Sequence, residues 1–180
     1  KKIGAVNCVT NNKTVNGTNT DWTGYYKTLP NIKKTKNRKV IILGYGGASH
    51  AIHYVLKKRG FKDILIFNRS KKKIKYSNKT EYTKTYSDLE THLDGVFLII
   101  NTTPINPLLK KHLRFITKST IVSDIVYSPK NTKFLKQFPK NKKIYGISML
   151  IEQAKPCFKM WFGKNPSVDE KMLNAIHKKI

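Results

Sequence analysis

The stretch Val40-Ile41-Ile42-Leu43-Gly44-Tyr45-Gly46-Gly47-Ala48-Ser49 determines the fold that we expect for this chain. Four apolar residues lead into a glycine-rich turn, and apolar residues then recur at helical spacing as far as Gly60. A glycine-rich turn between a strand and a helix indicates dinucleotide binding, with the pyrophosphate at the helix N-terminus. The alternative is a structural glycine turn without a ligand. We expect the pyrophosphate to contact Gly44, Gly46, Gly47, Ala48 and Ser49.

The end of the next apolar run indicates which dinucleotide would bind. Ile64-Leu65-Ile66-Phe67 is followed by Asn68-Arg69-Ser70, about 20 residues beyond the glycines, where an acidic residue would bind the ribose 2′-hydroxyl of NAD. That acid is absent, and Arg69, Ser70 and Lys73 instead offer cations and hydrogen-bond donors that suit a 2′-phosphate. Together with Asn68, these residues predict NADP(H) as the cofactor. The alternative interpretation is a solvated, lysine-rich loop.

The charge of the chain raises a second hypothesis, nucleic-acid binding. The 180 residues, enough for one ordinary α/β domain, include 36 Lys and Arg against 10 Asp and Glu. The excess is almost all lysine, and it is spread along the whole chain without a nucleic-acid-binding motif. We therefore expect solvated surface charge and no specific nucleic-acid partner, with weak attraction to polyanions at low salt.

Three further features limit the classes of function. No apolar run approaches the ~20 residues of a membrane-spanning helix, and no signal-peptide pattern is visible, so we expect no membrane partner. Cys8 and Cys157 are far apart in the sequence and lack metal or redox spacing, which favours reduced thiols and a cytoplasmic protein. His50 and His53 share a helix face without a third ligand nearby, so we expect no metal site.

The remaining sequence alternates predicted strands with predicted helices, which indicates a doubly wound parallel sheet with its ligand at the carboxyl ends of the strands. The predicted strands are 3–9, 14–17, 40–43, 64–67, 98–100, 120–126 and 143–145. The predicted helices run from Thr20 or Asp21 to about Leu29, over 48–59, from Ser70 through the following lysines, over 88–93 and 108–113, around Pro156 with a kink, and from a capping box at 167–170 to about 178.

Seven motifs occur in an order that resembles the shikimate dehydrogenase family, and together they cover nearly the whole chain. They are Gly4-Ala5-Val6-Asn7, Asn19-Thr20-Asp21, Gly44-Tyr45-Gly46-Gly47-Ala48-Ser49, Asn68-Arg69-Ser70, Leu98-Ile99-Ile100-Asn101-Thr102-Thr103-Pro104, Asp124-Ile125-Val126-Tyr127-Ser128-Pro129, and residues 146–154 with Phe158 and Trp161-Phe162-Gly163. The resemblance implies a Rossmann-like NADP-binding fold. It also implies reversible, NADPH-dependent reduction of 3-dehydroshikimate to shikimate, a step of aromatic amino-acid biosynthesis.

The resemblance also implies the residues of the site. Asp21 would pair with a catalytic lysine and hydrogen-bond the substrate, and the other substrate contacts would be Asn7, Tyr127 and Gln153. The cofactor would further be lined by Thr103, Ile125, Gly146 and Met149. The residues alone leave other interpretations open, namely Asp21 as a helix cap, Asn7 as a strand-end hydrogen-bonding group and Met149 as core packing.

The chain departs from the family at its start. In the family a substrate domain with the catalytic lysine precedes the first motif, and Lys1 and Lys2 do not match that lysine. We expect three parts: residues 1–20 as a remnant of the substrate domain, 21–166 as the NADP-binding domain, and 167–180 as a helix that packs toward the substrate domain. The missing domain would act in cis or in trans, and a homodimer is a further hypothesis. The alternative function is a non-catalytic NADP-binding module.

Overall fold

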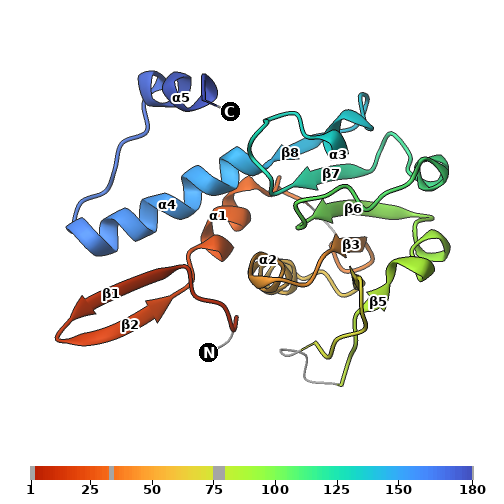
Figure 1. Cartoon of the computed structure of the whole chain (residues 1–180), viewed down its shortest axis with the longest axis horizontal. Coiled ribbons are helices and arrows are strands. Elements are labelled where there is room, and N and C mark those ends of the chain that lie inside the picture. The colour runs from red at the N-terminus through yellow and green to blue at the C-terminus, as the bar shows by residue number, and fades with distance from the viewer. Residues whose placement is uncertain (1–2, 33–34, 75–79, 180) are drawn as a thin grey trace.

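The computed structural model describes residues 3–32, 35–74 and 80–179, and its centre is a six-stranded parallel sheet (Figure 1). The strands are β3 (Lys39–Leu43), β4 (Ile64–Asn68), β5 (Lys84–Thr85), β6 (Val96–Asn101), β7 (Ile121–Asp124) and β8 (Lys143–Tyr145). Their order is β5-β4-β3-β6-β7-β8, so the chain first adds strands on one side of β3 and then on the other. This is the predicted doubly wound topology, and its switch point lies at the carboxyl end of β3.

The sheet is covered on both faces because its central strands are apolar on both sides. Val40 and Ile42 of β3 belong to one core cluster, Ile41 and Leu43 belong to the other, and all four side chains are fully buried. The first face packs against the helices α1 (Asp21–Thr28), α2 (Gly47–Lys58) and α4 (Gly146–Phe162). The second face packs against α3 (Lys133–Lys136) and the 3-10 turns η1 (Tyr86–Asp88), η2 (Glu90–His92) and η3 (Lys110–Phe115).

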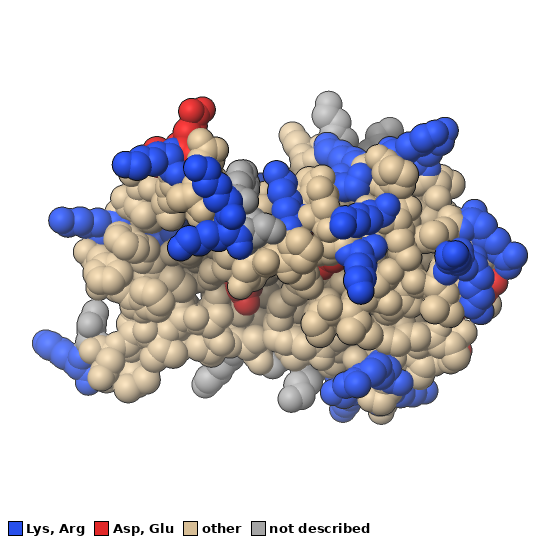
Figure 2. All heavy atoms as spheres, turned by 45° about the horizontal axis from the view of Figure 1, so that its top comes forward, with Lys and Arg blue, Asp and Glu red and all other residues tan. Residues whose placement is uncertain are grey.

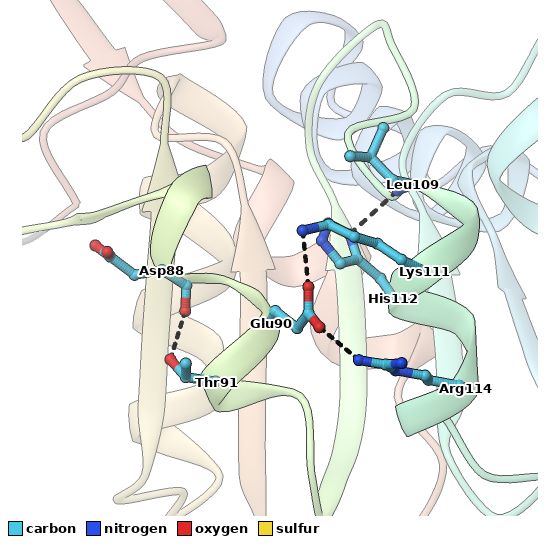
Figure 3. Close-up of polar contacts among 7 residues, drawn as sticks. All are labelled: Asp88, Glu90, Thr91, Leu109, Lys111, His112 and Arg114. Atoms are coloured by element: carbon cyan, nitrogen blue, oxygen red, sulfur yellow. Dashed lines mark hydrogen bonds and ion pairs between the residues drawn. The ribbon is translucent and has the colours of Figure 1, made fainter.

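A small ion-pair network joins η2 to η3 on the second face (Figure 3). The Glu90 carboxylate accepts bonds from Lys111 Nζ and from the Arg114 guanidinium, each at 2.8 Å. The bond from Lys111 is the main reason why the pKa of Glu90 lies below its ordinary value. Within η3, Nδ1 of buried His112 accepts the backbone N–H of Leu109 at 3.1 Å. These contacts join η2 to η3 and lie on the face of the sheet opposite the helices of the first face.

A hairpin and the C-terminal helix lie outside the sheet (Figure 1). Strands β1 (Cys8–Asn12) and β2 (Thr14–Thr18) pair antiparallel, and every residue of β2 is exposed. The Trp161 indole N–H on α4 donates to the Val9 carbonyl at 2.9 Å, which ties the hairpin to that helix. The last helix is α5 (Glu170–His177).

The prediction that Ser70 opens a helix is wrong for the part of that segment that the structure describes. Residues 71–74 are not helical, and residues 75–79 lie outside the described ranges. This segment instead pairs with the segment around Thr83. The Lys72 N–H donates to Thr83 Oγ1 at 2.9 Å, and the Thr83 N–H donates to the Lys72 carbonyl at 2.8 Å. These bonds between the two segments use the backbone groups of Lys72 that a helix would need.

Other boundaries also differ from the prediction. The first strand begins at Cys8, five residues later than expected from the apolar run, and α3 was not predicted at all. Helix α5 is capped by Asp169, whose Oδ1 accepts the Met172 N–H at 2.8 Å, so the expected capping box beginning at Ser167 lies two residues too early. Helix α4 continues through Pro156. Among the described residues, no helix combines the length and apolar character that crossing a membrane requires.

Candidate active site

The glycine turn after β3 is built against the loop that follows β6. Gly44 has a φ of +105°, and a Cβ there would lie 2.5 Å from Thr102 Oγ1 and 2.7 Å from Thr103 Cγ2. The Thr102 hydroxyl and N–H both donate to the Leu43 carbonyl at 2.8 Å, which fixes the two loops to each other. Only glycine fits this position without strain, as the sequence predicted for a tight turn. Thr103 therefore borders the turn.

The start of α2 has open space beside its N-cap, and the first N–H groups of an α-helix have no partner within the helix. Gly46 is the N-cap, and a Cβ added there would meet no atom within 4 Å. The first turn of α2 carries no acidic residue that would compete with an anion. Ser49 is fully buried, in keeping with close packing of the helix. A twelve-residue helix with open space beside its N-cap can hold a phosphate group.

The predicted 2′-phosphate residues lie beside the glycine turn, because β4 is the parallel neighbour of β3. The Gly44 N–H donates to the Phe67 carbonyl at 2.7 Å, at the strand end that leads into Asn68. Arg69 and Lys73 have exposed side chains, as expected of groups that bind a ligand from solvent. A solvated, lysine-rich loop would show the same exposure.

The predicted substrate residues form one polar cluster from three distant segments. Asn7 Nδ2 donates to Asp21 Oδ1 at 2.8 Å, to Thr20 Oγ1 at 2.9 Å and to Gln153 Oε1 at 3.1 Å. Asn7 precedes β1, Thr20 and Asp21 stand at the start of α1, and Gln153 lies on α4. Burial raises the pKa of the Asp21 carboxyl, although the hydrogen bond from Asn7 opposes that shift. The sequence pattern alone could not bring these residues together.

Thr20 is a member of this cluster that sequence reasoning considered only as a helix cap. Its side chain makes no capping bond. The Thr20 N–H donates to Asn7 Oδ1 at 2.7 Å, and the Thr20 hydroxyl donates to Gln153 Oε1 at 3.2 Å. This buried residue therefore orients both side-chain amides. Its place in the Asn19-Thr20-Asp21 motif was the available signal.

The two cysteines, distant in the sequence, meet beneath the cluster. The side chains of Cys8 and Cys157 share a hydrogen bond, and both residues are buried and not disulfide-bonded. Burial raises the pKa of the Cys8 thiol to about 11, and the bond to Cys157 adds to the shift. Cys157 Sγ also lies 3.2 Å from Thr20 Oγ1. A buried thiol with a raised pKa, such as Cys8, stays protonated and acts as a small packing group and not as a nucleophile.

A pocket of about 330 Å³ joins the polar cluster to the glycine turn. It is lined by Asn7, Asp21, Ala48, Ile125, Tyr127, Gly146, Met149, Leu150 and Gln153. All of these except Leu150 are residues that the sequence analysis assigned to substrate or cofactor. The remaining predicted cofactor residues do not line this pocket; they are Gly44, Gly46, Gly47, Ser49, Asn68, Arg69, Ser70, Lys73 and Thr103. The pocket thus brings together all the predicted substrate residues and four of the predicted cofactor residues, Ala48, Ile125, Gly146 and Met149.

Two glycines permit the close packing that shapes this pocket. A Cβ at Gly146 would collide with the Ile125 carbonyl, so the start of α4 can lie directly against the loop after β7 only with glycine there. A Cβ at Gly24 would lie 2.6 Å from the Met149 carbonyl and 2.9 Å from the Gln153 Cβ. Helix α1 therefore packs directly on α4 and brings Asp21 to Gln153. In the ranges that the structure describes, no group of three His, Cys, Asp or Glu residues is placed to bind a metal.

Comparisons with known proteins agree on one family. Residues 27–135 match the family model described as shikimate / quinate 5-dehydrogenase. The chain is 36% identical to the shikimate dehydrogenase (NADP(+)) of Staphylococcus haemolyticus, over 99% of this chain and 69% of that protein. It is 40% identical to the protein of the same name from Aquifex aeolicus, over 91% of this chain and 62% of that protein.

Solved structures give the same result. A crystal structure of a shikimate dehydrogenase in complex with NADP+ matches with a TM-score of 0.77 and 31% identity, covering 99% of this chain and 68% of that one. The shikimate dehydrogenase of Aquifex aeolicus matches with a TM-score of 0.76 and 34% identity, covering 99% and 66%. The chain thus spans about two thirds of the length of these relatives.

Proposed function

The chain belongs to the shikimate / quinate 5-dehydrogenase family, and from this we propose that it is the NADP(H)-binding part of a shikimate dehydrogenase. The reaction would be the reversible, NADPH-dependent reduction of 3-dehydroshikimate to shikimate. The observation that carries the proposal is the shared pocket, in which Asn7, Asp21 and Gln153 lie together with Ala48 at the start of α2 and with Ile125, Gly146 and Met149. A polyhydroxylated acid bound to these three side chains would lie next to the nicotinamide.

Each side chain of the cluster has chemistry that suits this reaction. NADPH, when bound, supplies the hydride. Asn7 and Gln153 carry amides that both donate and accept, so they can bind neighbouring hydroxyl groups, and their present bond to each other at 3.1 Å would be replaced by the substrate. Asp21 keeps one carboxylate oxygen beyond its bond to Asn7, and this oxygen can orient a lysine ammonium that protonates the developing alkoxide. The family supplies that lysine from its substrate domain; Lys1 and Lys2 lie outside the described residues.

The cofactor residues divide into three groups along the proposed binding path. The pyrophosphate would lie at Gly44, Gly46, Gly47, Ala48 and Ser49, the 2′-phosphate at Asn68, Arg69, Ser70 and Lys73, and the nicotinamide near Thr103, Ile125, Gly146 and Met149. Tyr127 would complete the substrate side. The open space at Gly46 supports the first group, since the protein itself does not require glycine there.

The outer face of α4 supports a further domain as partner. Large apolar side chains are exposed on the hairpin and on the last turns of α4, among them Val15 at 72%, Trp161 at 54% and Phe162 at 61%. A largely apolar groove of about 460 Å³ also runs between α4 and α5. We propose that this face binds the rest of the substrate domain, in cis or in trans, and that residues 1–20 are a remnant of that domain, 21–166 bind NADP(H), and 167–180 pack toward it. A homodimer through the same face is the competing occupant, which light scattering would detect.

The basic surface does not favour a nucleic-acid function. Figure 2 shows Lys and Arg scattered over the displayed face, interrupted by other residues and not gathered into one patch. We propose a cytoplasmic location because Cys8 and Cys157 are buried thiols that form no disulfide, as reducing compartments favour.

A fluorescence titration with NADPH and NADH tests the proposed cofactor. NADPH should bind more tightly, Arg69→Ala should remove that preference, and Lys62→Ala, which removes a charge before β4 at its other end, should leave it unchanged. Gly46→Ala should weaken both cofactors while the free energy of unfolding stays within ~0.5 kcal/mol, since its methyl group enters open space. Equal affinity for the two cofactors would contradict the NADP assignment.

An activity assay separates the enzyme from the non-catalytic module. If the chain completed with a family substrate domain binds NADPH but does not oxidise shikimate, the non-catalytic module is the better conclusion.

A further inference from the structure

Asn101 and Asp124 form a buried polar pair at the carboxyl ends of β6 and β7. The two residues are direct partners in the parallel ladder, and each is only 1% exposed. Asn101 Nδ2 donates to Asp124 Oδ1 at 3.2 Å. A polar pair this deep in the sheet is retained only where its hydrogen bonds are satisfied. Its other partners therefore indicate what it does.

The Asn101 amide holds the loop after β6. Its Nδ2 also donates to the carbonyls of Thr103 and Ile105, each at 3.1 Å. Its Oδ1 accepts the Thr103 N–H at 3.1 Å and the Thr103 hydroxyl at 2.8 Å. The Asn101 side chain thus binds the N–H, the carbonyl and the hydroxyl of Thr103, and this hydroxyl also lies 2.8 Å from the Ile105 carbonyl.

The Asp124 carboxylate holds the loop after β7. Its Oδ1 accepts the Val126 N–H at 3.0 Å, and its Oδ2 accepts the hydroxyl of Thr132 at 2.6 Å. Thr132 in turn caps α3 by accepting the Leu135 N–H at 3.1 Å. The carboxylate therefore fixes the Ile125–Val126 peptide from one side, while the start of α4 at Gly146 presses on the same peptide from the other.

These contacts end at two of the residues assigned to the nicotinamide side of the cofactor site, Thr103 and Ile125. We propose that Asn101 and Asp124 are positioning residues that set the nicotinamide end of the site and leave the adenosine end unaffected. The inference rests on the proposed function, because it presupposes that NADP(H) binds along this edge of the sheet. Neither residue would touch the cofactor; both would act through the two loops that they join.

The adenosine end has its own supports. The loop after β4 is held by the bonds of Asn68 to the Ser70 carbonyl at 3.0 Å and of Lys72 to Thr83 at 2.9 Å. The glycine turn is fixed by Thr102, whose bonds to Leu43 do not involve Asn101 or Asp124. Loss of the Asn101–Asp124 bond should therefore loosen one end of the site and not the other.

Asp124→Asn tests this selectivity with two probes, NADPH and 2′,5′-ADP, which has the phosphorylated adenosine without the nicotinamide. An amide keeps the size of Asp124 but cannot accept all three donors, since one end carries hydrogens. The Kd for NADPH should rise about tenfold, in line with the loss of a hydrogen bond to a charged group. The Kd for 2′,5′-ADP should change by less than about twofold.

Two further variants keep the test decisive. Thr132→Val removes one donor to the same carboxylate without touching a cofactor residue, so it should raise the NADPH Kd about threefold and spare 2′,5′-ADP, even if Asp124→Asn does not fold. Thr120→Val is the matched control, because its buried hydroxyl donates to the Val96 carbonyl at 2.9 Å at the other end of the sheet. It should lower stability but leave the ratio of the two Kd values unchanged.

The outcomes separate the two proposals. A wild-type chain that binds neither probe overturns the proposed function and this inference with it. A wild-type chain that binds both probes, with Asp124→Asn and Thr132→Val weakening the probes equally or not at all, overturns only the positioning role. Selective loss of NADPH affinity supports both.

Discussion

Two regions of the molecule differ in how far they bury their apolar side chains. The sheet region consists of β3 to β8 with α2, and the outer region consists of the hairpin and residues 157–179. Val40, Ile41, Ile42 and Leu43 have no exposed surface, and both faces of the sheet are covered by the chain itself. In the outer region β2 is exposed throughout, and Phe162 is 61% exposed. The sheet region thus buries its own apolar side chains. The outer region instead exposes large apolar side chains, which is typical of protein–protein interaction surfaces.

Paired truncations give the largest contrast between the regions. Ile42→Ala should lower the free energy of unfolding by about 3 kcal/mol, because it removes buried methylene groups and leaves a cavity. Phe162→Ala should lower it by less than ~1 kcal/mol, because most of that ring already faces solvent. Urea unfolding of both variants measures the difference.

A large loss of stability in Phe162→Ala would break the comparison, since it would mean that the chain itself buries the outer region in solution. Self-association could produce that burial, so the measurement should be repeated over a range of protein concentrations. A concentration-dependent midpoint would favour the homodimer as the occupant of this face.

The same contrast explains how much could be predicted from the sequence. The sheet region was predicted well because its signals are local: buried parallel strands read as apolar runs, and the turn at Gly44 and the helix end at Gly60 both have positive φ. The doubly wound parallel sheet was predicted from these signals, and the family was predicted from the order of the seven motifs; both predictions are confirmed. The prediction that strands alternate with helices was correct although two predicted helices are 3-10 turns, η2 and η3.

The rest depends on contacts that no local pattern contains. Residues 71–74 pair with the segment around Thr83, and this pairing overrides the helix expected from Ser70. The neighbours Cys8 and Cys157 come from β1 and α4, so their spacing of 149 positions concealed their contact. Asn101 and Asp124 stand in motifs that the sequence analysis quoted, but their bond appears only when β6 and β7 lie side by side.

Gly24→Ala tests the junction between the two regions. A Cβ on α1 would lie 2.6 Å from the Met149 carbonyl on α4, so the two helices would have to separate. We expect a loss of about 2 kcal/mol, typical of overpacking. Because Asp21 and Gln153 lie on these helices, the side-chain amide signals of Asn7 and Gln153 in NMR spectra should also move. Unchanged amide signals would show that the polar cluster does not depend on this packing.

A pH titration should affect the sheet region through His53 on α2. Burial lowers the pKa of His53 to about 4, with Lys57 adding to the shift and Glu81 opposing it. Because the pKa of His53 is lower in the folded state than in the unfolded state, the neutral side chain contributes its full stability at pH values above the unfolded pKa near 6.5. This contribution to the free energy of unfolding is lost as the pH falls toward 4. The loss should reach about 2 kcal/mol at pH 5.

Urea unfolding of wild type and His53→Gln at pH 8 and pH 5 isolates this contribution. Carboxyl groups with raised pKa values, Asp21 and Asp124, act in the opposite direction, since their contribution is favoured at low pH. They are common to both proteins and cancel in the difference. Equal pH dependence of the two proteins would mean that His53 is not buried in the neutral form.

The smallest expected effect lies in the Lys27–Glu152 ion pair, which joins α1 to α4. Glu152 accepts Lys27 at 2.9 Å and also bonds Lys155, which stands one turn further along α4. Burial alone would raise the pKa of Glu152, but the bonds from Lys155 and Lys27 outweigh it, so the pKa lies below the ordinary value. Lys27 is 51% exposed, so solvent screens the pair, and Glu152→Gln should cost only about 0.5 kcal/mol at low salt. In 1 M NaCl the difference from wild type should vanish. The contact at Gly24 indicates that close packing of two backbones holds α1 against α4. If Glu152→Gln cost several times more and the loss persisted in salt, charge would instead be the main interaction between the two helices.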